Sequence, residues 1–279
     1  MKLLLFTQKN RLLLLAMMLT FCSIYGQKVD TLQICYYKQN PYSYNDNGTM
    51  RGIEIEIIQE YVKWLETAKN IKQPVKYNEY TSFEDFYFSF KRVSGARIGL
   101  GSVTINSERT KELDFTTPYL KDVAFLITNG NSPDIKTKTP TEILRALGSM
   151  TAVTMNNTSL HKYLLELKKE NLKDMPIEFE SDETKILDNI SKNVLHYGYI
   201  NAVSFWYYLR NNPKRFLKMQ KVLSKSSQNL GFILPKESSH KALFDEFFAG
   251  PNGYKKSPQY RAMLEKYLGS YMAQNIAVN

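Results

Sequence analysis

The chain has 279 residues with 37 Lys and Arg against 27 Asp and Glu, a formal net charge of +10, and only two cysteines. This length provides for two domains of modest size, each with its own hydrophobic core. The basic surplus suits a protein that handles anionic solutes or lies near anionic surfaces, whereas the lack of a long basic run and of any nucleic-acid motif excludes nucleic acid as the partner.

The first 26 residues have the features of a secretory signal peptide. Three cations precede an apolar run over 12–21 that is too short to span a bilayer and is followed by small and polar residues. We expect cleavage after Gly26. A lipoprotein site at Cys22 is the alternative, although the bulky Phe21 stands where that site usually has a small residue. The exported chain would keep only Cys35, which excludes an internal disulfide, and no later segment is apolar enough for a membrane helix.

The first half of the chain alternates strand-like and helix-like segments. Strands are predicted at 32–37, 75–80 and 97–103, and helices from residue 53 and over 83–92. Between the first strand and the first helix, Asn47 and Gly48 can form a tight hairpin turn. This alternation predicts a parallel sheet covered by helices. In such sheets, ligands bind beyond the carboxyl ends of the strands.

The segment from Gly101 to Leu120 carries the strongest functional signal. The hydroxyls of Ser102 and Thr104 stand at the carboxyl end of a predicted strand, and Arg109 follows in the next turn. A guanidinium presents a planar fork of donors that matches a carboxylate. The pattern therefore predicts a clamp for a small anion if the turn lies in a cleft. The alternative is a solvated cluster of surface charges.

The second half of the chain continues the alternation. Strands are predicted at 123–128, 150–155, 176–179, 198–204 and 228–234, and helices at 140–148, 160–169, 182–195 and from 258 onward. The polar run from Asn156 to Ser159 would cap the helix that follows it, and the free amides of a helix N-terminus can receive an anion.

Two segments resemble signatures of the family 3 extracellular solute-binding proteins, the amino-acid-binding branch of the two-lobed periplasmic receptors. The stretch GSVTINSERTKELDFTTPYL is similar to G-x-[ST]-I-T-x-x-R-x-x-x-x-[DA]-F-[ST]-x-P-Y, with matches at Thr104, Arg109, Asp114, Phe115, Thr116, Pro118 and Tyr119. The stretch PYSYNDNGTMRGIEIEIIQEYVKWL resembles the opening of the family at Pro41, Tyr42, Gly48 and Gly52. The resemblance runs from about Leu32 to Gly269.

The resemblance implies an α/β fold of the type II, periplasmic-binding-protein-like kind. Two parallel-rich sheets, each flanked by helices, would be joined by a two-strand hinge. Residues 1–26 would be the signal peptide, 27–123 with 230–279 the first lobe, and 124–229 the second lobe. The protein would lie in the periplasm.

The resemblance also implies roles for individual residues. Arg109 would pair with a ligand carboxylate, helped by Ser102 and Thr104 and by Thr158 from the facing lobe. Phe83 stands where the family often places an apolar wall over the ligand, although it could equally be the first core residue of its helix. The motif around Thr158 usually has Gly where this chain has Asn157, and Asn tolerates the left-handed conformation better than most residues.

Trp206 departs from the pattern. Family members that bind amino acids usually hold the ammonium with an Asp after the strand that precedes this position. The face of a Trp offers a cation–π contact of about 1 to 2 kcal/mol, which is less than the cost of losing an ionic partner. Either the ligand lacks an α-ammonium there, or another acid such as Asp182 or Glu183 is recruited, or the pocket has changed task. Trp206 could also simply pack under the lobe.

We therefore expect a monomeric binding protein that closes around a small carboxylate-containing solute, an amino acid or a related molecule, for ABC-type uptake through a membrane permease or for sensing. The scattered His161, His196 and His240 have no ligand spacing, and no nucleophile elbow or phosphate loop is present. The sequence thus predicts no catalytic residue, no metal site and no cofactor. The alternatives are a dehydratase-like enzyme on the same fold and a degenerate receptor that acts as a protein-interaction or sensor subunit.

Overall fold

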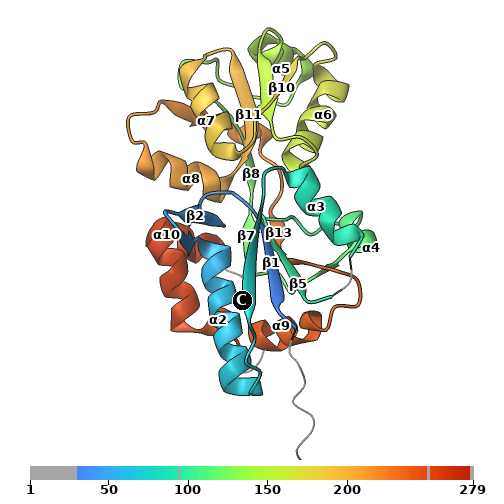
Figure 1. The fold of residues 1–279 in the computed structure, drawn as a ribbon. Coiled ribbons are helices and arrows are strands. Elements are labelled where there is room, and N and C mark those ends of the chain that lie inside the picture. Colours follow the sequence, from blue (N-terminus) through green and yellow to red (C-terminus); the bar gives the residue numbers. More distant parts are fainter. Residues whose placement is uncertain (1–29, 94, 250–251, 277–279) are drawn as a thin grey trace, which may run out of the picture. The chain divides into compact units, whose positions relative to one another are not determined.

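The computed structural model describes residues 30–93, 95–249 and 252–276 (Figure 1). The chain divides into Met1–Asp30 and Thr31–Asn279, and the account below concerns the second unit. The predicted signal peptide and the alternative site at Cys22 lie outside the described residues. No helix in the described part of the chain has the length and hydropathy needed to cross a membrane.

The first sheet has five strands in the order β4-β1-β5-β14-β6. Strand β1 (Leu32–Tyr37) runs parallel to β4 (Val75–Tyr80) and to β5 (Arg97–Leu100). Strands β14 (Ile233–Leu234) and β6 (Asp114–Phe115) complete the sheet in antiparallel pairs. The carboxyl ends of β1 and β5 therefore lie at one edge of the sheet, where the loop with the predicted hydroxyls begins.

Helices and a hairpin surround this sheet. They are the hairpin β2 (Tyr44–Asp46) and β3 (Thr49–Arg51), and the helices α2 (Ile53–Lys69), α3 (Phe83–Lys91), α4 (Arg109–Glu112), α9 (His240–Ala249), η2 (Tyr254–Lys256) and α10 (Pro258–Ile276). The start of α2 requires Gly52, because its φ is 120° and a Cβ there would lie 2.1 Å from the Tyr42 carbonyl oxygen. Helix α3 starts where the Ser82 side chain accepts a hydrogen bond from the Asp85 amide at 3.0 Å.

The second sheet has the order β10-β9-β11-β8-β12. Strands β10 (Ile177–Phe179), β9 (Thr151–Thr154) and β11 (His196–Asn201) are parallel, and β8 (Ala124–Asn129) and β12 (Leu217–Met219) add antiparallel pairs. The helices of this half are α5 (Pro140–Leu147), α6 (Ser159–Asn171), α7 (Glu183–Lys192), α8 (Ala202–Asn211) and η1 (Lys221–Leu223).

Two short strands connect the halves. Strand β7 (Leu120–Asp122) pairs antiparallel with β13 (Gln228–Leu230) between the two sheets (Figure 1). The predicted two-lobed α/β architecture with a two-strand connection is thereby confirmed. Several boundaries differ from expectation. The strand predicted at 198–204 already ends at Asn201, where α8 follows from Ala202. The strand predicted at 97–103 ends at Leu100, and the strand predicted at 228–234 is two strands, β13 and β14.

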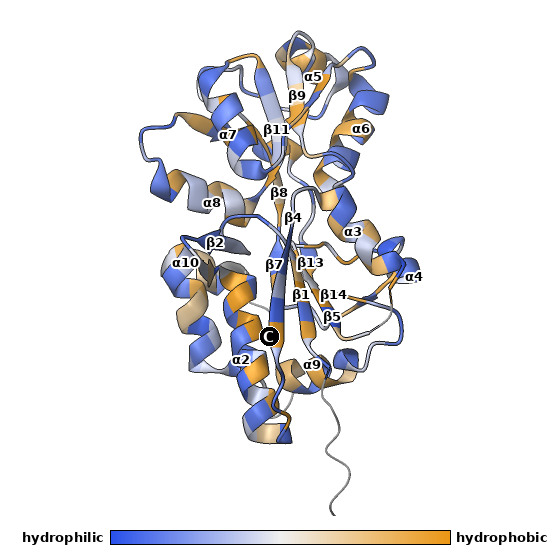
Figure 2. Ribbon diagram, viewed as in Figure 1, coloured by the Kyte–Doolittle hydropathy of each residue, from blue (hydrophilic) through white to orange (hydrophobic). Residues whose placement is uncertain are grey.

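The hydrophobic core has three clusters. One is centred on the first sheet with α2, α9 and α10, and another on the second sheet with α5 and α6. The third joins buried residues from both halves, including Tyr37 and Phe83 from the first and Met155 and Phe205 from the second. Figure 2 shows apolar residues on the strands of both sheets and on the helices packed against them. This shared cluster lies next to the cavity described below.

Candidate functional site

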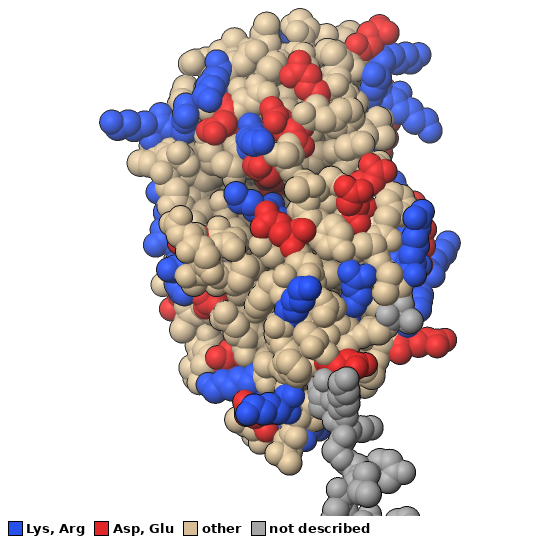
Figure 3. Space-filling view, in the orientation of Figure 1, with Lys and Arg blue, Asp and Glu red and all other residues tan. Residues whose placement is uncertain are grey.

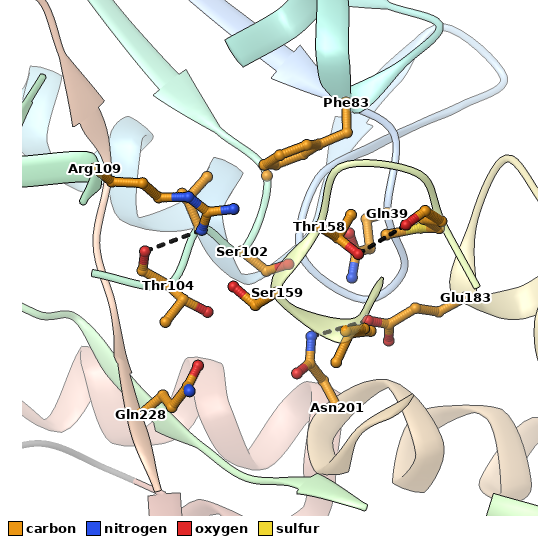
Figure 4. A pocket seen from close by; sticks show the side chains of 14 residues that line it. Gln39, Phe83, Ser102, Thr104, Arg109, Thr158, Ser159, Glu183, Asn201 and Gln228 are labelled. Atoms are coloured by element: carbon orange, nitrogen blue, oxygen red, sulfur yellow. Dashed lines mark hydrogen bonds between the residues drawn. The ribbon is translucent and has the colours of Figure 1, made fainter. Parts of the chain in front are cut away.

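A narrow cavity lies where loops of the two lobes meet. It is lined by Gln39, Phe83, Gly101, Ser102, Val103, Thr104 and Arg109 from the first lobe, by Met155, Thr158, Ser159, Leu160, Glu183 and Asn201 from the second, and by Gln228 of β13. Its volume is about 30 Å³. In Figure 4, Arg109 lies at one end of the cavity and Glu183 with Asn201 at the other.

Two adjoining cavities extend this gap between the lobes. One, of about 230 Å³, shares Phe83, Arg109, Thr158 and Ser159 with the central cavity. The other, of about 200 Å³, shares Gln39 and Glu183 with it. On the face drawn in Figure 3, basic and acidic side chains are interspersed, so the net positive charge of the chain does not gather there into one patch.

The hydroxyl loop after β5 is held by a buried acid. Ser102 has a φ of 47°, a left-handed conformation that is unfavourable for a residue with a Cβ. Its amide donates a 2.9 Å hydrogen bond to Glu54, and the Tyr119 hydroxyl (2.5 Å) and the Ser43 hydroxyl (2.7 Å) donate to the same carboxyl group. Burial raises the pKa of Glu54. These contacts keep Ser102 and Thr104 at the cavity wall.

Arg109 lies at the other side of this loop, at the first position of α4. Its amide donates to Asn106 Oδ1 at 2.9 Å, and its Nη1 donates to the Thr104 carbonyl oxygen at 3.1 Å. The guanidinium carbon lies 5.4 Å from the centre of the Phe83 ring and 5.5 Å from that of Tyr87. Such cation–π contacts are favourable when the cation is removed from water. The structure therefore places Arg109 at the cavity and not in bulk solvent.

The guanidinium of Arg109 has unused donor capacity. Burial lowers its pKa, but an arginine keeps its charge in proteins. Among the described residues, no carboxylate forms an ion pair with Arg109, because the neighbouring Glu108 binds Lys162 and Glu112 binds Lys91. A guanidinium has five N–H donors, and one of them is used by Thr104. The remaining donors are available to an anion.

Thr158 closes the same region from the second lobe. It caps α6, because its Oγ1 accepts from the His161 amide at 3.1 Å and donates to the Met155 carbonyl oxygen at 2.9 Å. The preceding Asn157 has a φ of 57°, which confirms the expected left-handed turn. The first turn of α6 thus faces the cavity through Thr158, Ser159 and Leu160. The free amides and partial positive charge of a helix N-terminus favour an anion at this end of the cavity.

Phe83 lies both in the core and at the cavity wall, so its position fits either of the alternatives considered from the sequence. It is only 8% exposed and packs in the core against Tyr37, with ring centres 6.1 Å apart. It also lines the cavity beside Arg109. The Phe83 ring therefore packs in the core and lines the cavity at the same time.

Trp206 does not line the cavity. It lies in α8, where its Nε1 donates to the Leu268 carbonyl oxygen at 2.8 Å and its ring lies 6.2 Å from that of Tyr271. The family resemblance placed it directly after the strand, but β11 ends at Asn201, five residues earlier. Asn201 therefore occupies the strand end at the cavity, and we leave Trp206 out of the site.

A contact across the hinge helps to end strand β11 at Asn201, because it stabilises the start of α8. Asp122 of β7 accepts from the Val203 amide at 3.4 Å at the start of α8, and from the Val123 amide at 2.7 Å. The Tyr42 hydroxyl donates to its other oxygen at 2.6 Å. An acid beside a helix N-terminus stabilises that helix. Burial raises the pKa of Asp122 to about 6, and these hydrogen bonds oppose the increase.

Glu183 completes the far end of the cavity. It follows Asp182, whose side chain caps α7 by accepting from the Lys185 amide at 2.9 Å. Its Oε1 accepts from the Asn201 side-chain amide at 2.9 Å, whereas its Oε2 is buried without a hydrogen-bond partner among the described residues. Burial, with a smaller contribution from the Asp122 charge, raises the pKa of Glu183 to about 8, against the opposing effect of Asn201 and Ser204.

Sequence reasoning recovered one end of this site and missed most of the other. From the sequence, Glu183 is considered only as a replacement for the Asp that family members use to hold the ammonium. Glu54 and Asn201 are not identified from the sequence. The sequence carries no signal for their burial, because the groups that surround them come from distant segments. Among the residues that the structure describes, no group of His, Cys, Asp and Glu could hold a metal ion. The arrangement is suited to hold a small polar molecule with an anionic group at Arg109.

Sequence comparison gives two findings. A profile of the bacterial extracellular solute-binding proteins, family 3, matches residues 32–270. Over 99 residues the chain is 33% identical to the L-cystine-binding protein TcyJ of Escherichia coli (strain K12), covering 35% of this chain and 34% of that protein. The match thus spans about a third of the length of the curated relative.

Structure comparison finds the same fold. A putative L-cystine ABC transporter from Listeria monocytogenes has a TM-score of 0.70 at 17% identity, covering 87% of this chain and 98% of that one. An ancestral amino acid-binding protein, AncCDT-1, described as a precursor of cyclohexadienyl dehydratase, has a TM-score of 0.65 at 16% identity, covering 85% and 95%. At these identities the likeness establishes the fold alone.

Proposed function

Because the chain belongs to the bacterial extracellular solute-binding proteins of family 3, we propose that it binds a small carboxylate-containing solute, an amino acid or a related molecule, between its two lobes. One observation carries this proposal. Arg109 faces a cavity lined by both lobes, and among the residues that the structure describes most of its donors are unused and no acid is paired to it.

The solute carboxylate would lie between Arg109 and the first turn of α6. Hydrogen bonds between a guanidinium and a carboxylate are charge-assisted and roughly twice as strong as neutral ones. The hydroxyls of Ser102 and Thr104, which have no hydrogen-bond partner in the described part of the chain, would add donors from the first lobe. The helix dipole of α6 would add partial positive charge from the second. Only a closed arrangement brings all of these groups to one carboxylate.

Binding would require the lobes to separate and close again. The central cavity, of about 30 Å³, is much smaller than the adjoining cavities of about 230 and 200 Å³, so a solute that reaches from Arg109 to the far end would need this central part to widen. Rotation about β7 and β13 would widen the gap, and contacts made only in the closed state would then favour closure. One contact that joins the lobes in this structure is the ion pair of Lys162 with Glu108, in which Nζ donates to both carboxylate oxygens at 2.7 and 2.8 Å.

The family and the signal-peptide features of the first 26 residues support a proposed cellular role. The protein would be exported to the periplasm and act as a monomer with a first lobe of residues 27–123 and 230–279 and a second lobe of residues 124–229. It would deliver its solute to a membrane permease or report it to a sensor. The name of the relative found by sequence, an L-cystine-binding protein, supports an amino acid as the solute.

A ligand screen with matched variants tests the proposal. Thermal shift against amino acids, dicarboxylates, short peptides and cell-wall fragments should identify a stabilising solute. Arg109→Ala should abolish that shift, and Arg109→Lys should retain little of it, because Lys lacks the planar fork. Arg145→Ala is the control, since Arg145 lies exposed on α5 and pairs with Glu142. A solute retained equally well by Arg109→Ala would refute the clamp.

A dehydratase-like enzyme is the second candidate, and Glu183 is the observation that favours it. A buried carboxyl group whose pKa is raised to about 8 is protonated at neutral pH, as a general acid must be. The test is turnover of prephenate-like acids by the wild type and by Glu183→Gln. Turnover that the substitution abolishes would replace the binding-protein proposal. A chain that neither binds nor converts any small molecule but retains a stable protein partner would instead be a degenerate receptor.

A further inference from the structure

We propose that Trp206 and Arg210 of α8 form a latch, in which the two side chains hold the C-terminal helix α10 of the first lobe against the second lobe and thereby raise the affinity for the solute. The inference rests on the proposed function, because it needs lobes that close around a solute. It gives a role to Trp206, which departs from the family pattern and does not line the cavity between the lobes.

The latch begins with an interruption in α10. This helix extends from Pro258 to Ile276, but Gly269 within it has a φ of 76° and a ψ of 162°. These angles are far from helical values, so the segment before Gly269 ends as a helix does. The last four carbonyl groups of a helix lack amide partners in the helix itself. Among them here are the carbonyl groups of Tyr267 and Leu268, the two residues directly before Gly269.

Two side chains of α8 donate to these carbonyl groups. Trp206 Nε1 donates to the Leu268 oxygen at 2.8 Å. Arg210 Nη1 donates to the Tyr267 oxygen at 3.3 Å, and a guanidinium suits this place because a helix C-terminus carries partial negative charge. Beyond the interruption, the Tyr271 ring lies 6.2 Å from the Trp206 ring. A helix of the second lobe therefore caps a helix end of the first, where Figure 1 shows α8 next to α10.

The latched segment of α10 is fixed to the first lobe. The Tyr267 hydroxyl accepts from the Gly52 amide at 3.0 Å and donates to Glu56 at 2.6 Å, both at the start of α2. Leu268 and Ala273, which lie on either side of the interruption, are buried in the core cluster of the first sheet. The carbonyl groups that accept from α8 therefore cannot follow α8 if it moves.

Helix α8 is fixed to the second lobe. The Tyr208 hydroxyl donates to Asp188 of α7 at 2.6 Å, and Arg215, just after α8, pairs with the same carboxylate at 3.6 Å. The first turn of α8 lies at the hinge, where the Val203 amide donates to Asp122. The latch residues lie in the turns that follow, so a rotation of the second lobe moves them against α10.

The latch therefore belongs to the arrangement of the lobes seen here. Because a hydrogen bond is lost when donor and acceptor separate beyond about 3.5 Å, a shift of α8 by about 1 Å against α10 breaks both bonds. In the same arrangement Lys162 pairs with Glu108 across the gap and the central cavity is narrow. Contacts made in only one of two states favour that state. One hydrogen bond shifts such an equilibrium by about two- to tenfold, and the affinity for a solute held by that state changes by up to the same factor.

Trp206→Phe tests the latch, because Phe keeps an aromatic ring at this place and removes the N–H donor. L-cystine, L-glutamine, L-glutamate and any solute found in the thermal-shift screen are titrated into the exported chain by calorimetry, and dissociation is followed by stopped flow. We expect Trp206→Phe to weaken binding about three- to tenfold, mainly through faster dissociation. Trp64→Phe is the matched control and should bind as the wild type does, since Trp64 packs within the first lobe against Phe247, with ring centres 5.6 Å apart.

Two further readouts separate the latch from a general loss of structure. The number of solute molecules bound per chain should stay at the wild-type value in Trp206→Phe, whereas a partly misfolded protein would bind fewer. Arg210→Met removes the second donor and keeps an apolar stem. It should also weaken binding, and the variant with both substitutions should bind more weakly than either single variant.

The outcomes distinguish the two proposals. Wild-type affinity and dissociation rate in Trp206→Phe overturn the latch and leave the proposed function intact. Tighter binding does the same, because it would show that the contact favours separated lobes. An equal loss of affinity in Trp64→Phe also overturns the latch. If no probe and no other carboxylate binds the wild type, the proposed function fails, and this inference fails with it.

Discussion

Replacing Glu183 by Gln should stabilise the protein at neutral pH. The pKa of this carboxyl group is about 8 in the folded protein and 4.5 when it is unperturbed, and burial is the main cause. Between these values the unfolded chain has lost a proton that the folded chain still binds. The wild type therefore loses stability as pH rises from about 4.5 to about 8. Gln has the shape of the neutral acid and does not ionise.

The magnitude follows from the difference between the two pKa values. Each pH unit in this window costs the wild type about 1.4 kcal/mol. Relative to Glu183→Gln, the wild type should be nearly equal in stability at pH 4 and less stable by about 3 kcal/mol at pH 7. Asp122 also has a raised pKa, of about 6, but it is present in both proteins and cancels in the difference.

Urea unfolding of both proteins at pH 4, 5, 6 and 7 measures this difference. The control is Glu178→Gln on β10, an exposed residue whose substitution should change stability by less than about 0.5 kcal/mol at every pH. Parallel pH profiles for the wild type and Glu183→Gln would refute the burial argument. So would a variant that is less stable than the wild type at pH 7.

Three further substitutions test other parts of the site. Glu54→Ala should lower the free energy of unfolding by about 3 kcal/mol or more, measured in urea, because it leaves three buried donors without an acceptor; a loss below about 1 kcal/mol would contradict this. Thr158→Ala should cost about 1 kcal/mol through the lost cap of α6 and should weaken solute binding, so unchanged affinity would remove Thr158 from the site. Lys162→Ala should leave the melting temperature nearly unchanged, because exposed ion pairs contribute little, while solute dissociation in stopped flow becomes about twofold faster. An unchanged dissociation rate would show that the contact with Glu108 does not hold the lobes closed.

The local features of the chain were determined by its sequence. Hydrophobic periodicity predicted most strands and helices, and capping residues such as Thr158 marked helix starts, because both depend on neighbours within a few positions. The position of Arg109 after a strand was likewise visible, since the carboxyl ends of parallel strands share one edge. The motif around Arg109 also indicated the family that the profile match confirms.

The other end of the site was decided by the tertiary structure. Glu54 is 48 residues from Ser102, and Asp122 is 81 residues from Val203 in the first turn of α8. That distant acid helps to fix the end of β11 at Asn201, whereas the resemblance to the family pattern pointed to Trp206. The burial that raises the pKa of Glu183 also comes from segments that are distant in the sequence. Solvent exclusion and neighbouring charge come from segments that meet only when the chain has folded, so no local pattern can report them.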